Sequence, residues 1–213
     1  MKSIILLSGG LDSAVLLALA KHKGRDCIAL SFDYGQRHRL ELRAAKNIAK
    51  FYGASHRIIK IDYQSFGNSS LVSGIPVPKN SDLNAQEIPS TYVPARNTLF
   101  IAFTLAQAEL QGAEEIYFGA NKDDHIAYPD CRPEYFAAYQ TLINVATKQS
   151  VETKPPELVT PLLDKTKAEI VAFGNELKVP YHLTLSCYDP TPLGEHCGSC
   201  LSCEIRKKAF ASI

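Results

Sequence analysis

The chain has 213 residues and a formal net charge of +1, from 23 basic and 22 acidic side chains. Hydrophobic residues make up 46% and charged residues 21%, which is typical of a globular domain and excludes disordered, collagen-like and coiled-coil proteins. The balanced charge argues against a nucleic-acid partner, which would need a local basic patch. A chain of this length can bury about 70% of its unfolded surface as one domain.

No stretch of the sequence predicts a membrane-bound or secreted protein. The longest wholly apolar run, residues 14–20, is far shorter than the span of about 20 residues that a membrane helix needs. The apolar stretch after Lys2 is too short for a signal peptide. We therefore expect a cytoplasmic protein, whose six cysteines are metal ligands, core residues or reactive thiols rather than disulfides.

The first half of the chain alternates strands and helices. Strands are expected over residues 3–7, 27–32 and 56–61, and helices over residues 12–23 and 40–52. Leu42, Ala45 and Ile48 have helical spacing, and Gly24 and Gly53 are typical helix stops. Residues 62–93 break the alternation. A loop of this length is often a lid or a partner surface, and a mobile insertion without a role is an equal alternative.

The alternation resumes after residue 94. Helices are expected over residues 95–111, 134–148 and 166–177, strands over residues 115–120 and 158–162, and a short helix near residue 205. Thr166 and Glu169 have the spacing of a capping box. The alternation predicts an α/β fold with a doubly wound parallel sheet, which binds ligands at the carboxyl ends of its strands. We expect an α/β domain over residues 1–184, with a C-terminal segment, residues 185–213, packed on it.

The strongest nucleotide-binding signal lies between the first strand and the first helix. It comprises Leu7, Ser8, Gly9, Gly10, Leu11, Asp12 and Ser13. Two glycines let the backbone approach a phosphate, the helix N-terminus presents N–H groups, and the serines add hydroxyl donors. Asp12 is expected either to cap the helix or to help hold a Mg²⁺ on the phosphates. The alternative is a tight turn with an aspartate cap, and the lysine of a Walker loop is absent.

Four cysteines near the C-terminus predict a metal site. They are Cys187, Cys197, Cys200 and Cys203, and the last three form a C-x2-C-x2-C pattern. Four soft thiolates suit tetrahedral Zn²⁺ with no open position, so the site is expected to be structural. A redox pair, buried thiols, or replacement of one thiolate by His182 or His196 are the alternatives. Cys27 is expected in the core, and Cys131 is ambiguous.

Two cations fall in the first turns of expected helices, where positive charge opposes the helix dipole. Arg96 could hold a phosphate or a carboxylate through two hydrogen bonds, and Lys167 could neutralise a polyphosphate. A solvated surface side chain is the alternative for each. In the loop after residues 115–120, Asp123, Asp124 and Asp130 are candidates for reading the N–H edge of a purine-like base, and each is alternatively a loop or capping residue. Arg132 is a further substrate-binding candidate there.

The SGGLDS segment, residues 8–13, resembles the PP-loop of the ATP-pyrophosphatase superfamily, whose members cleave ATP between the α and β phosphates and adenylate a substrate oxygen. Further motifs follow in order along the chain: FDYGQRH at 32–38, YVPARN at 92–97, YPDCR at 128–132, DKTKAEI at 164–170 and the cysteine-rich run from 186 to 203. Together they resemble the 7-cyano-7-deazaguanine synthase family of queuosine biosynthesis.

This resemblance implies an adenine nucleotide alpha-hydrolase-like fold and the ATP-dependent conversion of 7-carboxy-7-deazaguanine and ammonia to the nitrile. The intermediates would be an adenylated acid and an amide. By the same resemblance, residues 7–13 hold ATP with Mg²⁺, and the four cysteines hold structural Zn²⁺. Asp12, Arg96 and Lys167 are the expected catalytic residues, and the protein is expected to be a homodimer.

The chain departs from the family pattern at one place. It reads Asp124-His125-Ile126-Ala127 where the family usually has Asp, Tyr or Phe, Ser and Gly before YPDCR. A related enzyme that stops at the amide, or that couples the acid to another amine, is therefore an alternative. A tRNA-thiolating PP-loop enzyme, which needs a reactive cysteine and a basic surface, is a second one. A zinc-stabilised nucleotide-binding module without turnover is a third.

Overall fold

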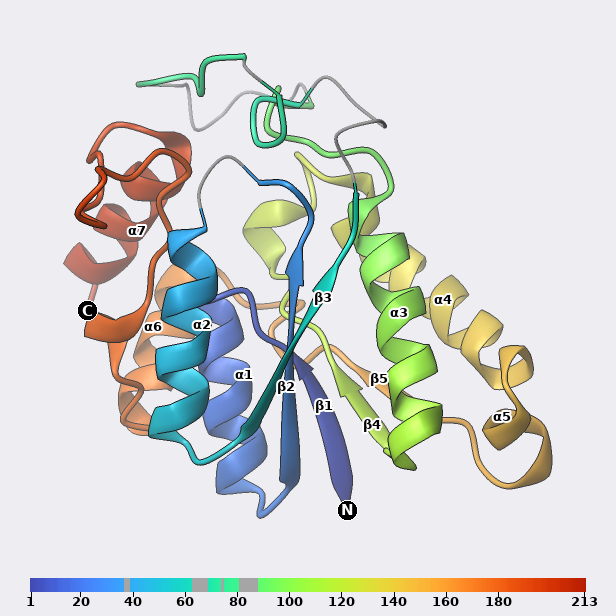
Figure 1. The fold of residues 1–213 in the computed structure, drawn as a ribbon. Helices are drawn as coiled ribbons and strands as arrows, with labels where there is room; N and C mark the ends of the chain where they lie inside the picture. Colours follow the sequence, from blue (N-terminus) through green and yellow to red (C-terminus); the bar gives the residue numbers. More distant parts are fainter. Residues whose placement is uncertain (37–38, 63–68, 74, 81–87) are drawn as a thin grey trace.

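The computed structural model describes residues 1–36, 39–62, 69–73, 75–80 and 88–213. Its sheet has five parallel strands in the order β3-β2-β1-β4-β5 (Figure 1). They are β1 (Lys2–Leu6), β2 (Asp26–Asp33), β3 (Ser55–Lys60), β4 (Glu115–Tyr117) and β5 (Glu157–Val159). The chain winds outward from β1 to β3 and then crosses to β4 on the other side of β1. This switch in direction confirms the predicted doubly wound sheet and opens a crevice between the loops after β1 and β4.

Helices cover both faces of the sheet (Figure 1). One face carries α1 (Leu11–His22), α2 (Leu40–Phe51) and α6 (Lys167–Glu176), and the other carries α3 (Arg96–Gln111) and α4 (Pro133–Ala146). In the described part of the chain, the remaining helices are α5 (Lys148–Glu152), α7 (Leu201–Ala211) and the short turns η2 (Lys122–Asp124), η3 (Pro129–Cys131) and η4 (Tyr181–Leu183). Within the described ranges, no helix combines the length and the apolar character that a membrane crossing requires.

Side chains of the central strand β1 pack in the two large hydrophobic clusters, which lie on opposite faces of the sheet. Ile4 packs in the cluster that contains Ile101 of α3, while its neighbour Ile5 packs in the cluster that contains Val15 of α1 and Ile48 of α2. All five of these side chains are fully buried. Successive side chains of a strand point to opposite faces, so a strand covered by helices on both sides is apolar throughout. This is why the continuous apolar run after Lys2 predicted a buried strand.

Some element boundaries differ from those expected. The last strand ends at Val159 rather than at residue 162, because the chain turns there, with Leu163 N–H donating to the Thr160 carbonyl at 3.2 Å. The helix expected over residues 134–148 is two helices. Thr147 has extended backbone angles, and its hydroxyl accepts from Ser150 N–H as the cap of α5. The C-terminal helix α7 is longer than expected, with 11 residues.

Within residues 62–93, the stretch 75–80 packs on the C-terminal segment, whereas Val72 and Val93 are buried in the core on the α3 side. Val77 is buried against Cys187, Cys200 and Cys203. Lys79 forms an isolated antiparallel bridge with Cys200, and the neighbouring Asn80 N–H donates to the Ser199 carbonyl at 2.8 Å. This stretch therefore covers the cysteine cluster. Its role as a lid or partner surface stays a prediction, and so does a domain boundary at residue 184.

The capping box that the sequence predicted opens α6. Thr166 Oγ1 accepts from Glu169 N–H, and the Glu169 carboxylate accepts from Thr166 N–H at 2.7 Å. We expect Thr166→Ala to lower the free energy of unfolding by about 1 kcal/mol, because the helix loses its cap. Urea denaturation measures this change. Thr141→Ala, at an exposed position inside α4, is the control that loses no cap. An unchanged urea midpoint for Thr166→Ala would contradict the prediction.

Candidate active site

The SGGLDS segment forms the connection from β1 to α1, as the sequence predicted. Gly9 has φ +91°, and a Cβ at this position would lie 2.2 Å from the Glu41 carbonyl oxygen and 2.9 Å from Ala45 N. Only glycine fits, so the loop packs directly against the first turn of α2. Gly10 is the N-cap of α1 and provides no side-chain cap. The N-terminal N–H groups of α1 are therefore the donors that this loop offers to a phosphate.

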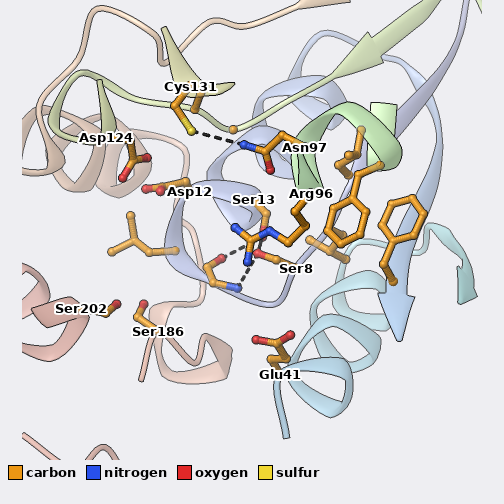
Figure 2. Close-up of a pocket in the computed structure, with 18 of the residues that line it drawn as sticks. Ser8, Asp12, Ser13, Glu41, Arg96, Asn97, Asp124, Cys131, Ser186 and Ser202 are labelled. Atoms are coloured by element: carbon orange, nitrogen blue, oxygen red, sulfur yellow. Dashed lines mark hydrogen bonds between the residues drawn. The ribbon is translucent and has the colours of Figure 1, made fainter. Parts of the chain in front are cut away.

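The two serines of the loop hold its shape. Ser13 Oγ donates to the Gly10 carbonyl at 3.0 Å and lies 3.1 Å from Ser8 Oγ, which accepts from Gly10 N–H at 3.3 Å. Ser8 is exposed and Ser13 is buried. These hydrogen bonds fix the shape of the loop, and Ser8 lies beside Ser13 at the cavity (Figure 2).

A cavity of about 310 Å³ opens beside this loop, at the carboxyl ends of β1, β2 and β4. Figure 2 shows residues that converge on it from the PP-loop, α2, α3, the loop after β4 and the C-terminal segment. The charged side chains that line the cavity are Asp12, Glu41, Arg96, Asp123, Asp124, Lys167 and Arg206. The crevice predicted for a doubly wound sheet is therefore present, and it is large enough for a small-molecule ligand.

Asp12 and Lys167 meet in one wall of the cavity. Lys167 Nζ donates to Asp12 Oδ2 at 2.6 Å, and Asn121 Nδ2 donates to the same oxygen at 3.2 Å. The helix-capping alternative for Asp12 is wrong, because Gly10 is the cap and Asp12 lies inside the first turn of α1. The other carboxylate oxygen of Asp12, Oδ1, is buried and has no hydrogen-bond partner in the described part of the chain. An unpartnered buried oxygen of this kind suits a cation or a donor brought by a ligand.

A second carboxyl group, that of Asp124, lies beside this pair. Asn121 Nδ2 donates to Asp124 Oδ2 at 2.5 Å and so bridges it to Asp12. Burial raises the pKa of Asp124 to about 6, with Lys167 opposing the rise and Asp12 adding to it. Burial lowers the pKa of Lys167, but the charges of Asp12 and Asp124 outweigh it and raise that pKa above its usual value. The lysine is therefore held as an ammonium between two acidic groups.

Arg96 begins α3 and faces the same cavity (Figure 2). Its Nη1 donates to the Tyr34 hydroxyl at 3.3 Å, and its guanidinium lies 5.7 Å from the centre of the Tyr34 ring and 5.9 Å from that of Phe100. No carboxylate of the described residues forms an ion pair with it. The guanidinium therefore keeps donor capacity for a ligand, and its catalytic role stays a prediction.

Asp130 and Arg132 lie behind the cavity and are not among the residues that line it. The Asp130 carboxylate accepts from Asn97 N–H at 3.2 Å, which ties down the start of α3. Arg132 Nε donates to the His125 carbonyl at 2.9 Å and holds the loop between η2 and η3. These hydrogen bonds let Asp130 and Arg132 stabilise the segments around the cavity. Direct contact of either residue with a substrate stays a prediction. His125 also does not line the cavity, and Ile126 is 60% exposed, so this unusual stretch lies outside the cavity wall.

The four C-terminal cysteines form one cluster. Their Sγ atoms all lie within 4.8 Å of one another, and three of the four side chains are buried. Cys187 Sγ accepts from the N–H groups of Asp189 and Cys197, each at 3.3 Å. No histidine belongs to a ligand group of this kind among the described residues, and His196 Nε2 instead accepts from Ser186 N–H at 3.4 Å. The arrangement can hold a metal ion with four sulfur ligands.

The other two cysteines are separate from this cluster. Cys27 is buried in β2, as predicted, and burial raises the pKa of its thiol to about 11. Cys131 is buried at the cavity, where it accepts from Asn97 Nδ2 at 3.3 Å, and burial raises its pKa far above the usual range. Neither is an activated thiolate.

The C-terminal segment forms part of the cavity wall. Leu185 N–H donates to the Gly9 carbonyl at 2.9 Å, which joins this segment to the PP-loop. Arg206 of α7 donates to the hydroxyls of Thr184 and Ser186 at 2.9 and 3.1 Å and also faces the cavity. Tyr188 packs on the cysteine cluster and lines the cavity. Sequence reasoning missed this connection, because no motif marks a backbone hydrogen bond between distant segments.

Solved structures with a similar fold include an NMN synthetase and a tRNA thiolase. This chain superimposes on NMN synthetase from Francisella tularensis with a TM-score of 0.50 and 20% identity, covering 92% of this chain and 70% of that one. The U34-tRNA thiolase NcsA from Methanococcus maripaludis gives a TM-score of 0.52 and 20% identity, over 100% of this chain and 65% of that one. At these identities, the likeness concerns the fold alone.

The sequence comparisons are more specific. The family model described as "Queuosine biosynthesis protein QueC" matches residues 2–213. A protein from Saccharophagus degradans is 50% identical over 211 residues, covering 98% of this chain and 92% of its own length. Another from Desulfatibacillum aliphaticivorans is 52% identical over 215 residues, covering 99% and 92%. Both bear the name 7-cyano-7-deazaguanine synthase. With the PP-loop, the cavity and the cysteine cluster in place, the chain belongs to the QueC family of queuosine biosynthesis proteins.

Proposed function

We propose that this protein is an ATP-dependent carbon–nitrogen ligase that converts 7-carboxy-7-deazaguanine and ammonia to 7-cyano-7-deazaguanine. Relatives about half identical over nearly the whole chain bear the name of that activity. The observation that carries the proposal is the Lys167–Asp12 pair, joined at 2.6 Å beside the SGGLDS loop and facing the cavity. An adenylation site needs a loop that binds phosphate, a positive charge and a carboxylate oxygen that can hold a cation. The SGGLDS loop, the Lys167 ammonium and Asp12 Oδ1 would supply these groups.

The chemistry follows from the poor reactivity of a carboxylate. A carboxylate oxygen of the acid attacks the α-phosphorus of ATP and releases pyrophosphate, and ammonia then displaces AMP to give the amide. A second ATP activates the amide oxygen, which leaves with AMP while the nitrogen gives up its two protons and the nitrile forms. The N-terminus of α1 would bind the polyphosphate, and Lys167 and Arg96 would neutralise charge that builds on it.

The same proposal includes two metal ions. Asp12 and Asp124 would hold Mg²⁺, since the free Oδ1 of Asp12 and the bridged carboxylate of Asp124 are hard oxygen donors. The ion would neutralise phosphate charge. The four-cysteine cluster would hold Zn²⁺, because thiolates at this spacing match its tetrahedral preference and leave no position for water. That zinc would stabilise the C-terminal wall of the cavity. A cytoplasmic homodimer is part of the proposal by resemblance.

Neither of the alternative enzymes gains support from the described residues. A thiolating enzyme needs a reactive cysteine, whereas Cys27 and Cys131 are both buried with raised pKa values. The amide-forming alternative depends on residues 125–127, which are outside the lining of the cavity.

The experiment that tests the proposed function is mass spectrometry of the product formed from the acid, ATP and ammonium. A mass equal to the nitrile supports the proposal, and an amide as the final product would overturn it.

Arg96 gives a kinetic prediction. We expect Arg96→Ala to lower kcat and kcat/KM together by about 10²-fold, if its free donors meet charge that develops in the transition state. Steady-state kinetics of pyrophosphate release measures this. Arg57→Ala, which removes an exposed arginine of β3 away from the cavity, is the control. A rise in KM alone would limit Arg96 to substrate binding, and unchanged kinetics would remove it from the site.

A further inference from the structure

The first residues of the FDYGQRH segment end β2, and none of them takes part in the proposed reaction. The described residues Phe32, Tyr34 and Gln36 of this segment line the cavity together with Glu41 of α2. Figure 2 shows the Glu41 carboxyl group directed toward the space below Ser8 and Arg96, apart from the wall that carries Asp12 and Asp124. Glu41 is thus the one carboxyl group on the β2 side of the cavity among the described residues that line it.

Gln36 holds the Glu41 carboxyl group in place. Gln36 is buried, its Oε1 accepts from Tyr34 N–H at 2.8 Å, and its Nε2 donates to the Phe32 carbonyl at 3.1 Å. The same Nε2 donates to Glu41 Oε1 at 2.9 Å. The backbone of Glu41 is fixed as well, because its carbonyl oxygen packs against Gly9. One oxygen of the carboxyl group is therefore anchored, and Oε2 has no hydrogen-bond partner among the described residues.

The surroundings of Glu41 suit a flat ring. Phe32 and Phe100 stack at 4.1 Å between ring centres, with Tyr34 edge-on to Phe100 at 5.4 Å. Burial raises the pKa of Glu41 to about 7, with the charge of Arg96 opposing the rise. Arg96 and Glu41 both line the cavity, but their side chains form no ion pair with each other. Apolar walls with a few fixed polar groups are typical of a site that orients a heterocycle.

Resting on the function proposed above, we propose that Glu41, with Gln36 as its positioning residue, reads the N–H edge of a purine-like ring bound between Tyr34, Phe100 and the PP-loop. Two rings in the reaction carry such an edge: adenine in ATP and the deazaguanine acid. Adenine presents an amino donor beside a ring-nitrogen acceptor, while deazaguanine presents two donors, the ring N–H and the 2-amino group. A carboxylate accepts from two donors, whereas a neutral carboxyl group or an amide offers one donor and one acceptor.

Isothermal titration calorimetry tests the proposal and separates the two rings. An α,β-methylene analogue of ATP and 7-carboxy-7-deazaguanine are titrated separately into wild type, Glu41→Ala, Glu41→Gln and the control Lys50→Ala, an exposed change on the same helix. We expect Glu41→Ala to weaken one ligand by about tenfold or more and Lys50→Ala to weaken neither. If the ring is adenine, Glu41→Gln retains most of the affinity, and if it is deazaguanine, Glu41→Gln loses as much as Glu41→Ala.

Deleting groups on the ligand keeps the test independent of folding. In the wild-type protein, a nucleotide without the 6-amino group or an acid without the 2-amino group should bind about tenfold more weakly. The same deletion should cost little in Glu41→Ala. Unchanged affinities of both ligands in a fully folded Glu41→Ala, or equal losses from the ligand deletion with and without Glu41, would overturn the proposal. Failure of the wild type to bind either ligand would instead overturn the proposed function.

Discussion

Replacing Cys200 with serine should remove the metal and unfold the C-terminal wall of the cavity. Cys200 is fully buried, and its Sγ lies 3.9 Å from that of Cys187. Metal binding at such a site is coupled to folding. The free energy of unfolding should therefore fall by more than about 3 kcal/mol, and the melting temperature by about 10 °C. Because Leu185 bonds to Gly9, we also expect the variant to lose ATP binding. Elemental analysis and thermal melting measure the two primary effects.

Cys27→Ala is the matched control for this experiment. It also removes a buried cysteine, but its thiol lies in β2, outside the cluster. It should keep a full metal complement even if the loss of core volume lowers its melting temperature. A Cys200→Ser protein that retains one zinc per chain and the wild-type melting temperature would contradict the assignment of the cluster.

Replacing Asp12 with alanine should abolish turnover while the fold survives. The change removes the acceptor of the Lys167 ammonium and the buried free oxygen proposed for Mg²⁺. We expect kcat to fall by about 10³-fold, a size typical of losing one preorganised electrostatic group. Since the two residues act as a unit, adding Lys167→Met to this variant should cost little more. Pyrophosphate release measures the rates, and circular dichroism checks the fold.

Asp26→Ala removes an exposed aspartate at the start of β2 and serves as the control for lost charge. It should leave kcat unchanged, because it lies at the opposite end of the strand from the cavity. Turnover of Asp12→Ala within a few-fold of wild type would show that the pair does not contribute to the chemistry.

The sequence predicted the parts of the fold that local patterns determine. The apolar run of β1, the glycine stops of α1 and α2 and the capping box of Thr166 and Glu169 each depend on neighbouring residues only. Element ends were less predictable. Thr147 and Thr160 lie where a turn competes with a continuing helix or strand, and the balance between them depends on tertiary packing.

The candidate site likewise contains features that neighbouring residues predict and features that depend on tertiary packing. The PP-loop and the cysteine cluster are short segments whose spacing predicts their chemistry, and the structure brings each together. Asp130 was expected at the substrate because its loop follows β4; its carboxylate accepts from Asn97 N–H at the start of α3, and its contact with a substrate stays a prediction. Gln36 lies in the FDYGQRH motif, which predicted no role for it, and Glu41 gave no signal of its own. Glu41 reaches the cavity where α2 packs against Gly9, a contact between segments that sequence spacing does not reveal.

The most direct test of ATP-dependent adenylation follows oxygen atoms. The wild-type enzyme is given 7-carboxy-7-deazaguanine with both carboxylate oxygens labelled with ¹⁸O, together with ATP and ammonium, and the nucleotide products are analysed by mass spectrometry. Each activation transfers a substrate oxygen to the α-phosphorus, so we predict pyrophosphate and ¹⁸O-labelled AMP, two labelled molecules for each nitrile formed. Unlabelled AMP, or ADP and phosphate as the only nucleotide products, would contradict adenylation at the SGGLDS loop.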